Sequence, residues 1–243
     1  MKNRITTAMI LAAGRGTRMA PLTDHCPKPL LPLAGKPLIE HHLEKLALAG
    51  FCDVVINHAY LGHLLPEQLG DGERWGMRIH YSAESTPLET AGGIIQALPL
   101  LGAQPFALIN GDVWVDGDYD ALATTSLPPQ QLGCLWMVEN PCHHPRGDFV
   151  LQEDGLLALP RTGAEHCLTF SGLSVLSPAL FAGLAEGVRP LAPVLRQAMS
   201  SQQLCGYRLS DRWVDVGTPQ RLAELDEFLR LTKLPSDESR ERQ

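Results

Sequence analysis

Short apolar runs alternate with longer segments of mixed polarity along the first half of the chain. The apolar runs predict buried strands, and apolar residues at helical spacing between them predict helices. The predicted strands are residues 7–13, 53–57, 78–81 and 106–110, and the predicted helices are residues 38–49, 60–69 and 90–98. This alternation favours an α/β fold with a mostly parallel sheet and helices on both faces.

The second half is less regular, and it mixes strands with a short hairpin and two helices. The predicted strands are residues 132–138, 170–176 and 204–209, the hairpin joins residues 149–151 and 156–159, and the helices are residues 192–199 and 219–232. We expect residues 1–232 to form one domain and residues 233–243 to form a polar C-terminal tail.

A glycine-rich turn follows the first predicted strand, with basic side chains behind it. Gly14 and Gly16 let the backbone turn sharply and present N–H groups to an anion. The nearby cations are Arg15, Arg18 and Lys28. Because ligands of open parallel sheets bind at the carboxyl ends of the strands, we expect this turn and Asp112 to meet at one edge. The pattern predicts a phosphate-binding site.

Two common phosphate-binding motifs do not match this turn. A Walker loop requires Ser or Thr after Gly-Lys, but Pro37 follows Gly35-Lys36. A dinucleotide fingerprint requires a third glycine where Met19 stands, and a suitably placed ribose-binding acid is also missing. An NAD-binding domain is therefore disfavoured.

Two aspartates stand in apolar surroundings. Asp112 follows the strand at residues 106–110, and Asp215 lies inside the apolar segment 213–217. A carboxylate in such a setting is costly unless it meets a cation. For Asp112, a turn aspartate that caps local backbone is the alternative. Asp215 is harder to explain as a turn residue.

Several motifs occur in a fixed order from residue 7 to residue 229. They are Gly14-Arg15-Gly16-Thr17-Arg18-Met19, Pro27-Lys28-Pro29-Leu30, Glu89-Thr90-Ala91-Gly92-Gly93, Asn110-Gly111-Asp112, Phe170-Ser171-Gly172 and Asp215-Val216-Gly217-Thr218. Together they resemble the signature of the sugar-1-phosphate nucleotidyltransferases. The resemblance implies a single Rossmann-like (GT-A-like) α/β domain with a mixed, mostly parallel central sheet. Residues 1–112 would then form a nucleotide-binding half and residues 113–232 a sugar-binding half.

The resemblance also implies the reaction. A phosphate oxygen of the sugar 1-phosphate attacks the α-phosphorus of a nucleoside triphosphate, and pyrophosphate leaves. Asp112 and Asp215 would bind Mg²⁺, Lys28 would neutralise the α-phosphate, and Arg18 would neutralise the pyrophosphate, so that Arg18, Lys28 and Asp112 are the expected catalytic residues. The expected nucleotide-binding residues are Leu11, Ala12, Ala13, Gly14, Arg15, Gly16, Thr17, Arg18, Lys28, Glu84, Gly92 and Gly93.

Within the family, residues 140–149, together with residues 110–114 and 169–172, resemble the corresponding segments of members that use UTP and N-acetylmuramate 1-phosphate in cell-wall recycling. The expected sugar contacts are Asn110, Asn140, Asp148 and Gly172, and Arg146 or Arg161 could meet the lactyl carboxylate. The chain departs from larger hexose-1-phosphate enzymes, because residues 149–169 lack the lysine that binds their sugar phosphate. We also expect no long C-terminal extension of the kind that those enzymes carry.

Other interpretations stay open at this point. A mannose- or glucose-1-phosphate guanylyl-, thymidylyl- or uridylyltransferase would share these motifs. A regulatory protein that binds nucleotide sugars without catalysis should have lost a catalytic group. This alternative is disfavoured because Arg18, Lys28, Asp112 and Asp215 are all present. A zinc site is a weak possibility because the ligand spacing is irregular; its ligands would be Cys142, His143, His144, His166 and Cys167.

Composition and charge indicate which binding partners and which cell compartment to expect. The 243 residues carry a formal charge of −7, which disfavours nucleic-acid binding. The six cysteines include no Cys-x-x-Cys pair, and neither a secretory leader nor a membrane-spanning run is visible. We expect a reduced, cytoplasmic protein without a membrane partner, and the sequence is compatible with a monomer.

Overall fold

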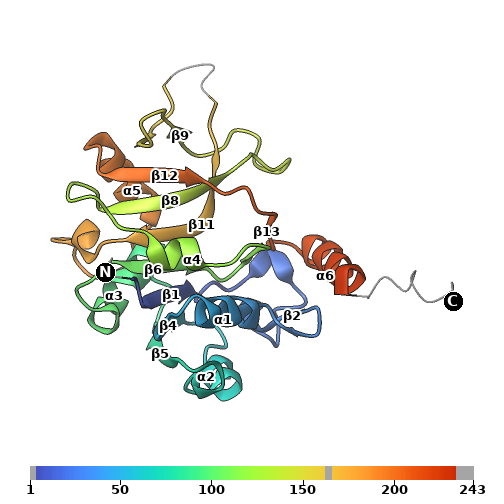
Figure 1. Ribbon diagram of the computed structural model, residues 1–243. Helices are drawn as coiled ribbons and strands as arrows, with labels where there is room; N and C mark the ends of the chain where they lie inside the picture. Colours follow the sequence, from blue (N-terminus) through green and yellow to red (C-terminus); the bar gives the residue numbers. More distant parts are fainter. Residues whose placement is uncertain (1–3, 162–165, 234–243) are drawn as a thin grey trace, which may run out of the picture.

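A seven-stranded sheet forms the centre of the computed structural model, which describes residues 4–161 and 166–233 (Figure 1). The strand order across the sheet is β12-β8-β11-β6-β1-β4-β5. In chain order these strands are β1 (Thr7–Leu11), β4 (Asp53–His58), β5 (Arg78–Ala83), β6 (Phe106–Asn110), β8 (Gly133–Val138), β11 (Thr169–Leu176) and β12 (Leu204–Arg208).

The sheet is mixed but mostly parallel, as the sequence predicts. Strands β5, β4, β1 and β6 run parallel to one another, and β12 runs parallel to β8. Strand β11 is antiparallel to both of its neighbours, β6 and β8. Residues Leu11 and Asn110 are register partners at the ends of β1 and β6, so the segments that follow these two strands leave the sheet side by side.

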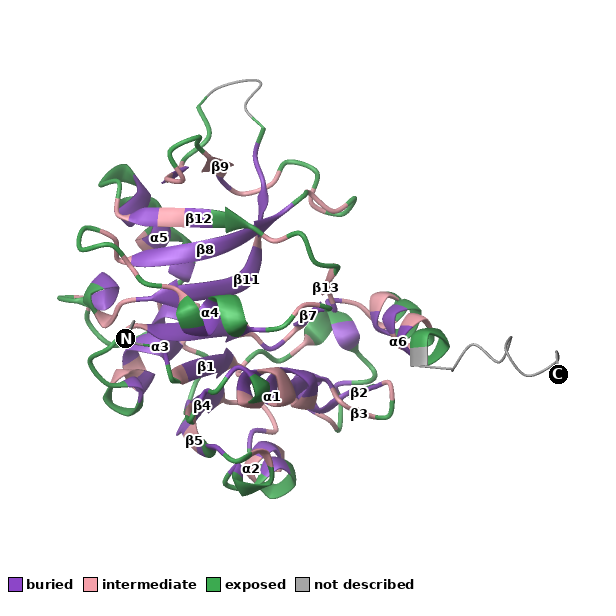
Figure 2. Cartoon of the chain, viewed as in Figure 1, coloured by how far each residue is buried: buried purple, intermediate pink, exposed green. Residues whose placement is uncertain are grey.

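Helices cover both faces of the sheet (Figure 1). Helices α1 (Leu38–Leu48), α2 (Leu64–Leu69) and α4 (Asp120–Thr124) pack into one apolar cluster, and α3 (Glu89–Leu101) and α5 (Leu191–Ser200) pack into another. Alternation along β1 explains the division: Ile10 joins the first cluster, whereas Met9 joins the second. Figure 2 shows the sheet as the most buried layer of the domain.

Helix α1 illustrates how sequence sets an element's length. Its buried residues include Ile39, Leu43 and Leu46, which share one face. The helix ends where Gly50 adopts a left-handed φ of 78° and the Phe51 N–H bonds the Leu46 carbonyl. Such a glycine turn satisfies carbonyls that the helix leaves without partners.

Two small additions complete the edge of the sheet that will matter for function. Strands β7 (Val113–Val115) and β13 (Trp213–Asp215) pair antiparallel, and α6 (Pro219–Lys233) follows directly. Helix α6 packs through Leu222, Leu225 and Leu229. The remaining strands are β2 (Pro32–Leu33), β3 (Lys36–Pro37), β9 (Val150–Leu151) and β10 (Leu157–Ala158), and short 3-10 helices span Thr17–Met19, Lys28–Leu30, Glu73–Trp75 and Pro178–Phe181.

The sequence-based boundaries differ from the structure in a few places. The helix expected at residues 60–69 begins only at Leu64, because Leu61 takes a left-handed φ of 51° and residues 60–63 form turns. The first strand ends at Leu11 rather than Ala13. Helix α4 and strand β7 were not predicted. The expected tail, apart from Lys233 at the end of α6, lies outside the described residues. None of the helices in residues 4–161 and 166–233 has the length and apolarity needed to cross a membrane.

A buried histidine beneath β7 gives a first testable prediction. Burial lowers the pKa of His42 to about 3, and its Nδ1 lies 2.6 Å from the Tyr119 hydroxyl. Because the unfolded chain binds a proton near pH 6.5 and the folded chain does not, stability should fall as pH drops from about 6.5 toward 3. The slope from this one group approaches about 1.4 kcal/mol per pH unit.

The His42→Gln variant should lose that contribution. Urea unfolding at several pH values would measure it as the difference in pH dependence between variant and parent. The exposed His25→Gln variant is the control, and it should keep the parent's pH dependence. Equal slopes for parent and His42→Gln would contradict the prediction.

Candidate active site

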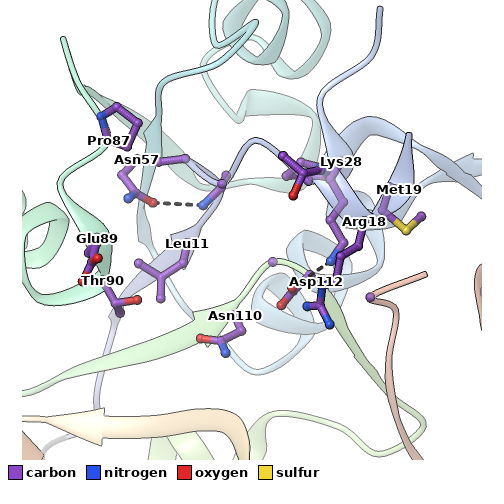
Figure 3. A pocket seen from close by; sticks show the side chains of 18 of the residues that line it. Leu11, Arg18, Met19, Lys28, Asn57, Pro87, Glu89, Thr90, Asn110 and Asp112 are labelled. Carbon is purple, nitrogen blue, oxygen red and sulfur yellow. Dashed lines mark hydrogen bonds and ion pairs between the residues drawn. The ribbon is translucent and has the colours of Figure 1, made fainter. Parts of the chain in front are cut away.

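A cavity of about 470 Å³ opens at the carboxyl ends of β1 and β6. Figure 3 shows its lining side chains. The glycine-rich turn and Asp112 both line it, which confirms that they meet at one edge of the sheet. The lining residues are Leu11, Ala12, Ala13, Gly14, Gly16, Thr17, Arg18, Met19, Lys28, Pro29, Asn57, Glu84, Pro87, Glu89, Thr90, Asn110, Gly111, Asp112 and Gly217. Its volume suits a ligand of nucleotide size.

The cations gather at one end of this cavity. The Lys28 Nζ lies 2.7 Å from the Asp112 Oδ2, and the Lys28 side chain is only 9% exposed. Figure 3 places Arg18 beside this pair. Gly16 makes the approach possible, because it has a left-handed φ of 64° and a Cβ there would lie 3.3 Å from the Lys28 Cβ. Arg18 forms no ion pair with any residue that the structure describes, so its charge is available to an anion.

The β7–β13 pair brings the two aspartates together. Asp215 is the register partner of Val113, the residue after Asp112. The Val216 N–H donates to the Asp112 carbonyl at 2.8 Å. Asp112 and Asp215 are 103 positions apart in the sequence, and they therefore lie close together at the cationic end of the cavity.

The Asp215 carboxylate is held on one side. Its Oδ2 accepts a hydrogen bond from Arg221 Nη1 at 2.8 Å and lies 3.3 Å from the His143 Nε2. Its Oδ1 lies 2.7 Å from the point that a Cβ on the cavity-lining Gly217 would occupy. Asp112 likewise uses Oδ2 for Lys28. Each aspartate thus directs one oxygen to a cation and leaves the other for a ligand.

A buried polar network supports the opposite end of the cavity. Asn57 accepts a hydrogen bond from the Ala12 N–H at 3.0 Å and donates to Glu84 Oε1 at 2.7 Å. Glu84 Oε2 accepts from the Leu88 N–H at 3.0 Å. The network ties the turn after β1 to the segment before α3, and Glu89, the first residue of α3, lines the cavity with a left-handed φ of 57°.

Removal of Asn57 should weaken this end of the cavity. Asn57→Ala leaves the Ala12 N–H and the buried Glu84 carboxylate without their partner, which should cost about 1–3 kcal/mol. We expect a higher KM for the nucleotide and a lower midpoint in urea unfolding. The control is Gln96→Ala, which removes a partly buried hydrogen bond to Ser82 and an exposed one to the Ala83 carbonyl. Unchanged stability and KM in Asn57→Ala would contradict this role.

Some predicted nucleotide contacts lie outside the cavity lining. Arg15 stacks over the Tyr60 ring at 5.3 Å. A Cβ on Gly92 would come within 2.3 Å of the Gly187 carbonyl oxygen, and one on Gly93 would lie 2.5 Å from Glu84 Oε1. Close packing therefore requires both glycines, and their contact with a base stays a prediction.

The predicted sugar contacts divide into two groups. Asn110 lines the cavity, and Gly172, at a left-handed φ of 84°, packs directly against it. Asn140 and Asp148 are outside the lining and hold their own loop. Asn140 donates to the Cys167 carbonyl at 2.8 Å and accepts from Thr169, while Asp148 accepts from the Phe170 N–H at 2.8 Å. Their contact with a sugar stays a prediction, as do those of Arg146 and Arg161.

The zinc alternative gains no support from the geometry. His144 Nε2 lies 3.0 Å from Asp148 Oδ1, and His166 lies 3.3 Å from Glu139. Within residues 4–161 and 166–233, no group of three or more His, Cys, Asp or Glu side chains is arranged to hold a metal ion. A metal ion in the cavity would therefore complete its coordination with waters or with substrate oxygens.

Sequence reasoning missed several residues that the structure places at the site. They are Asn57, His143 and Arg221. Asn57 ends a predicted strand next to the one that carries the glycine-rich turn, and this neighbour relation was the available signal. His143 and Arg221 depend on long-range packing, which local sequence patterns do not encode.

Comparisons with known proteins agree with this geometry. A family model described as nucleotidyl transferase matches residues 7–140. The chain belongs to the nucleotidyl transferase family and is an enzyme of that class. It is 52% identical to the N-acetylmuramate alpha-1-phosphate uridylyltransferase of Neisseria meningitidis serogroup B over 221 residues, which cover 89% of this chain and 95% of that protein.

Two further relatives extend the comparison. The N-acetylmuramate alpha-1-phosphate uridylyltransferase of Caulobacter vibrioides is 36% identical, over 88% of this chain and 92% of that protein. A putative glucose-1-phosphate thymidylyltransferase structure from Bacillus anthracis superposes with a TM-score of 0.78 at 19% identity, covering 92% of this chain and 95% of that one. This structural match supports the fold.

Proposed function

We propose that this enzyme transfers a uridylyl group from UTP to N-acetylmuramate α-1-phosphate, which gives UDP-N-acetylmuramate and pyrophosphate. The observation that carries the proposal is the 52% identity to a protein of that name over nearly the whole length of both chains. Cell-wall sugar recycling is the corresponding process. The set of charged residues at the cavity supports turnover rather than a regulatory role, because Arg18, Lys28, Asp112 and Asp215 are all present and close together.

The site's chemistry suits this reaction. The phosphate of a sugar 1-phosphate is already ionised, so no side chain needs to remove a proton from the nucleophile. Catalysis then depends on positioning and on neutralising charge at the α-phosphorus and at the departing pyrophosphate. Lys28, fixed by Asp112 in a mostly buried position, supplies one preorganised charge, and Arg18 supplies another.

Magnesium fits the donor set formed by the two aspartates. Mg²⁺ prefers hard oxygen ligands and often binds one or two carboxylates together with waters and substrate phosphates. Asp112 and Asp215 would hold it through the oxygens that are not bonded to Lys28 and Arg221. When bound, the ion would supply positive charge that stabilises the reacting phosphates.

Each half of the domain would bind one of the two substrates. Residues 1–112 carry the glycine-rich turn, Lys28 and the Asn57–Glu84 network, so this half would bind UTP. Residues 113–232 carry β11, the loop at residues 139–148 and α6, so this half would bind the sugar. Asp112 and Asp215 lie where the halves meet.

Pyrophosphate release tests the proposal. The purified enzyme would be assayed with Mg²⁺ and UTP against N-acetylmuramate, N-acetylglucosamine and glucose 1-phosphates, and then with dTTP and GTP in place of UTP. We expect strong preference for UTP with the muramate. Preference for another pair would keep the reaction class and overturn the assigned substrates.

A further inference from the structure

The reaction brings two phosphorylated substrates together, and each needs compensating charge. Arg15, Arg18 and Lys28 all belong to the nucleotide half. Residues 46–232 contain no lysine, so any strong cationic contact from the sugar half must come from arginine or a protonated histidine. The question is which of these side chains reaches the reaction centre.

Arg221 is in position to do so. It lies in the first turn of α6, its side chain is 18% exposed, and its Nη1 donates both to Asp215 Oδ2 at 2.8 Å and to His143 Nε2 at 2.7 Å. Its Nε bonds the Thr218 hydroxyl at 3.3 Å. These contacts fix the guanidinium plane and leave Nη2 as the nitrogen that can donate a hydrogen bond to a further acceptor.

The free nitrogen faces the cavity wall. A Cβ on Gly217 would lie 2.5 Å from Arg221 Nη2, 2.7 Å from Asp215 Oδ1 and 3.3 Å from Arg18 Nη2. Gly217 lines the cavity, so the space that its missing side chain leaves open is bordered by two guanidinium groups and one carboxylate oxygen. Two positive charges against one negative charge leave this space with a net positive charge. The arrangement is therefore suited to a phosphate.

The loop behind Arg221 connects this position to the sugar half. His143 belongs to residues 139–148, the loop that Asn140 and Asp148 anchor to the start of β11. The glycine-rich turn and Lys28, by contrast, belong to the half of the domain that would bind the triphosphate. A phosphate next to Arg221 is thus the one attached to the sugar.

We propose that Arg221 binds the phosphate of the sugar 1-phosphate, in the space over Gly217 that it shares with Arg18. This inference rests on the proposed function, because it assumes a sugar 1-phosphate as the second substrate. His143 and Asp215 hold the guanidinium in place, so the contact is preorganised before the sugar arrives.

Steady-state kinetics of Arg221→Gln would test the proposal at saturating Mg²⁺. We expect the KM for the sugar 1-phosphate to rise about 10- to 100-fold, the size expected for loss of a charge-assisted hydrogen bond, while the KM for UTP stays near the parent value. Arg221→Lys should recover part of the loss. Gly217→Ala should raise the same KM by filling the shared space. The control is Arg230→Gln, on the same helix, whose ion pair within residues 4–161 and 166–233 is with Asp226.

Several outcomes would overturn the assignment. A rise in the KM for UTP alone would give Arg221 to the triphosphate. A higher Mg²⁺ requirement with an unchanged KM for the sugar 1-phosphate would mean that Arg221 only orients Asp215. If Arg221→Gln fails to fold, Arg221→Lys and Gly217→Ala carry the test. The substrate preference of the parent enzyme tests the proposed function separately. If the parent prefers a different sugar 1-phosphate, the Arg221 variants are compared with that substrate, and the expected rise in its KM is unchanged.

Discussion

Lys28→Ala should reduce kcat by about 10²–10³-fold while the protein stays folded. The Lys28 ammonium is mostly buried and fixed at 2.7 Å from Asp112, so it provides a positive charge that needs no reorganisation when charge develops at the α-phosphate. Loss of one such group removes about 3–4 kcal/mol of transition-state stabilisation. Single-turnover and steady-state rates of pyrophosphate release would measure the effect.

Two further variants make the Lys28 result interpretable. Lys28→Met keeps most of the side-chain volume and should be as inactive as Lys28→Ala, because charge and not packing is what the reaction loses. Lys36→Ala removes a more exposed lysine that pairs with Glu44, and it should leave kcat unchanged. Near-normal kcat in Lys28→Met would show that the catalytic role given to Lys28 is wrong.

The sheet could be predicted because its information is local. The predicted strands at residues 53–57 and 106–110 contain the continuous apolar runs 54–56 and 106–109, as expected for strands covered on both faces, and the structure confirms both strands. The chain reversal at β11 could not be predicted in the same way. Its residues are as buried as those of the parallel strands, and pairing direction depends on how the chain returns to the sheet.

The site shows the same division between local and long-range information. The glycine-rich turn and Asp112 follow predicted strands, so their meeting at one edge could be inferred from strand direction. The pairing of β7 with β13 could not, because each strand is only three residues long. The contact of Arg221 with Asp215 could not be predicted from local sequence patterns for a similar reason, because it forms only when α6 packs beside β13.

Asp112→Asn is expected to lower turnover by about 10²–10³-fold and to raise the Mg²⁺ concentration needed for half-maximal activity. The substitution keeps the side chain's shape but removes the negative charge that both Lys28 and a divalent ion require. The Asp112 side chain is 39% exposed, so loss of its ion pair should change stability only modestly. Calorimetric titration with Mg²⁺ or Mn²⁺ in the presence of UTP provides a readout that does not depend on turnover.

The control for this variant is Asp120→Asn, which removes a similar ion pair at the surface, between Arg4 and Asp120, and should leave activity and metal binding unchanged. Comparison with Asp215→Asn then tests whether the two carboxylates act together. If both hold one ion, the double variant should be little worse than either single variant, because each removes most of the same interaction. Additive losses would instead mean that Asp112 and Asp215 act independently, and retention of activity and metal affinity by Asp112→Asn would remove Asp112 from the metal site.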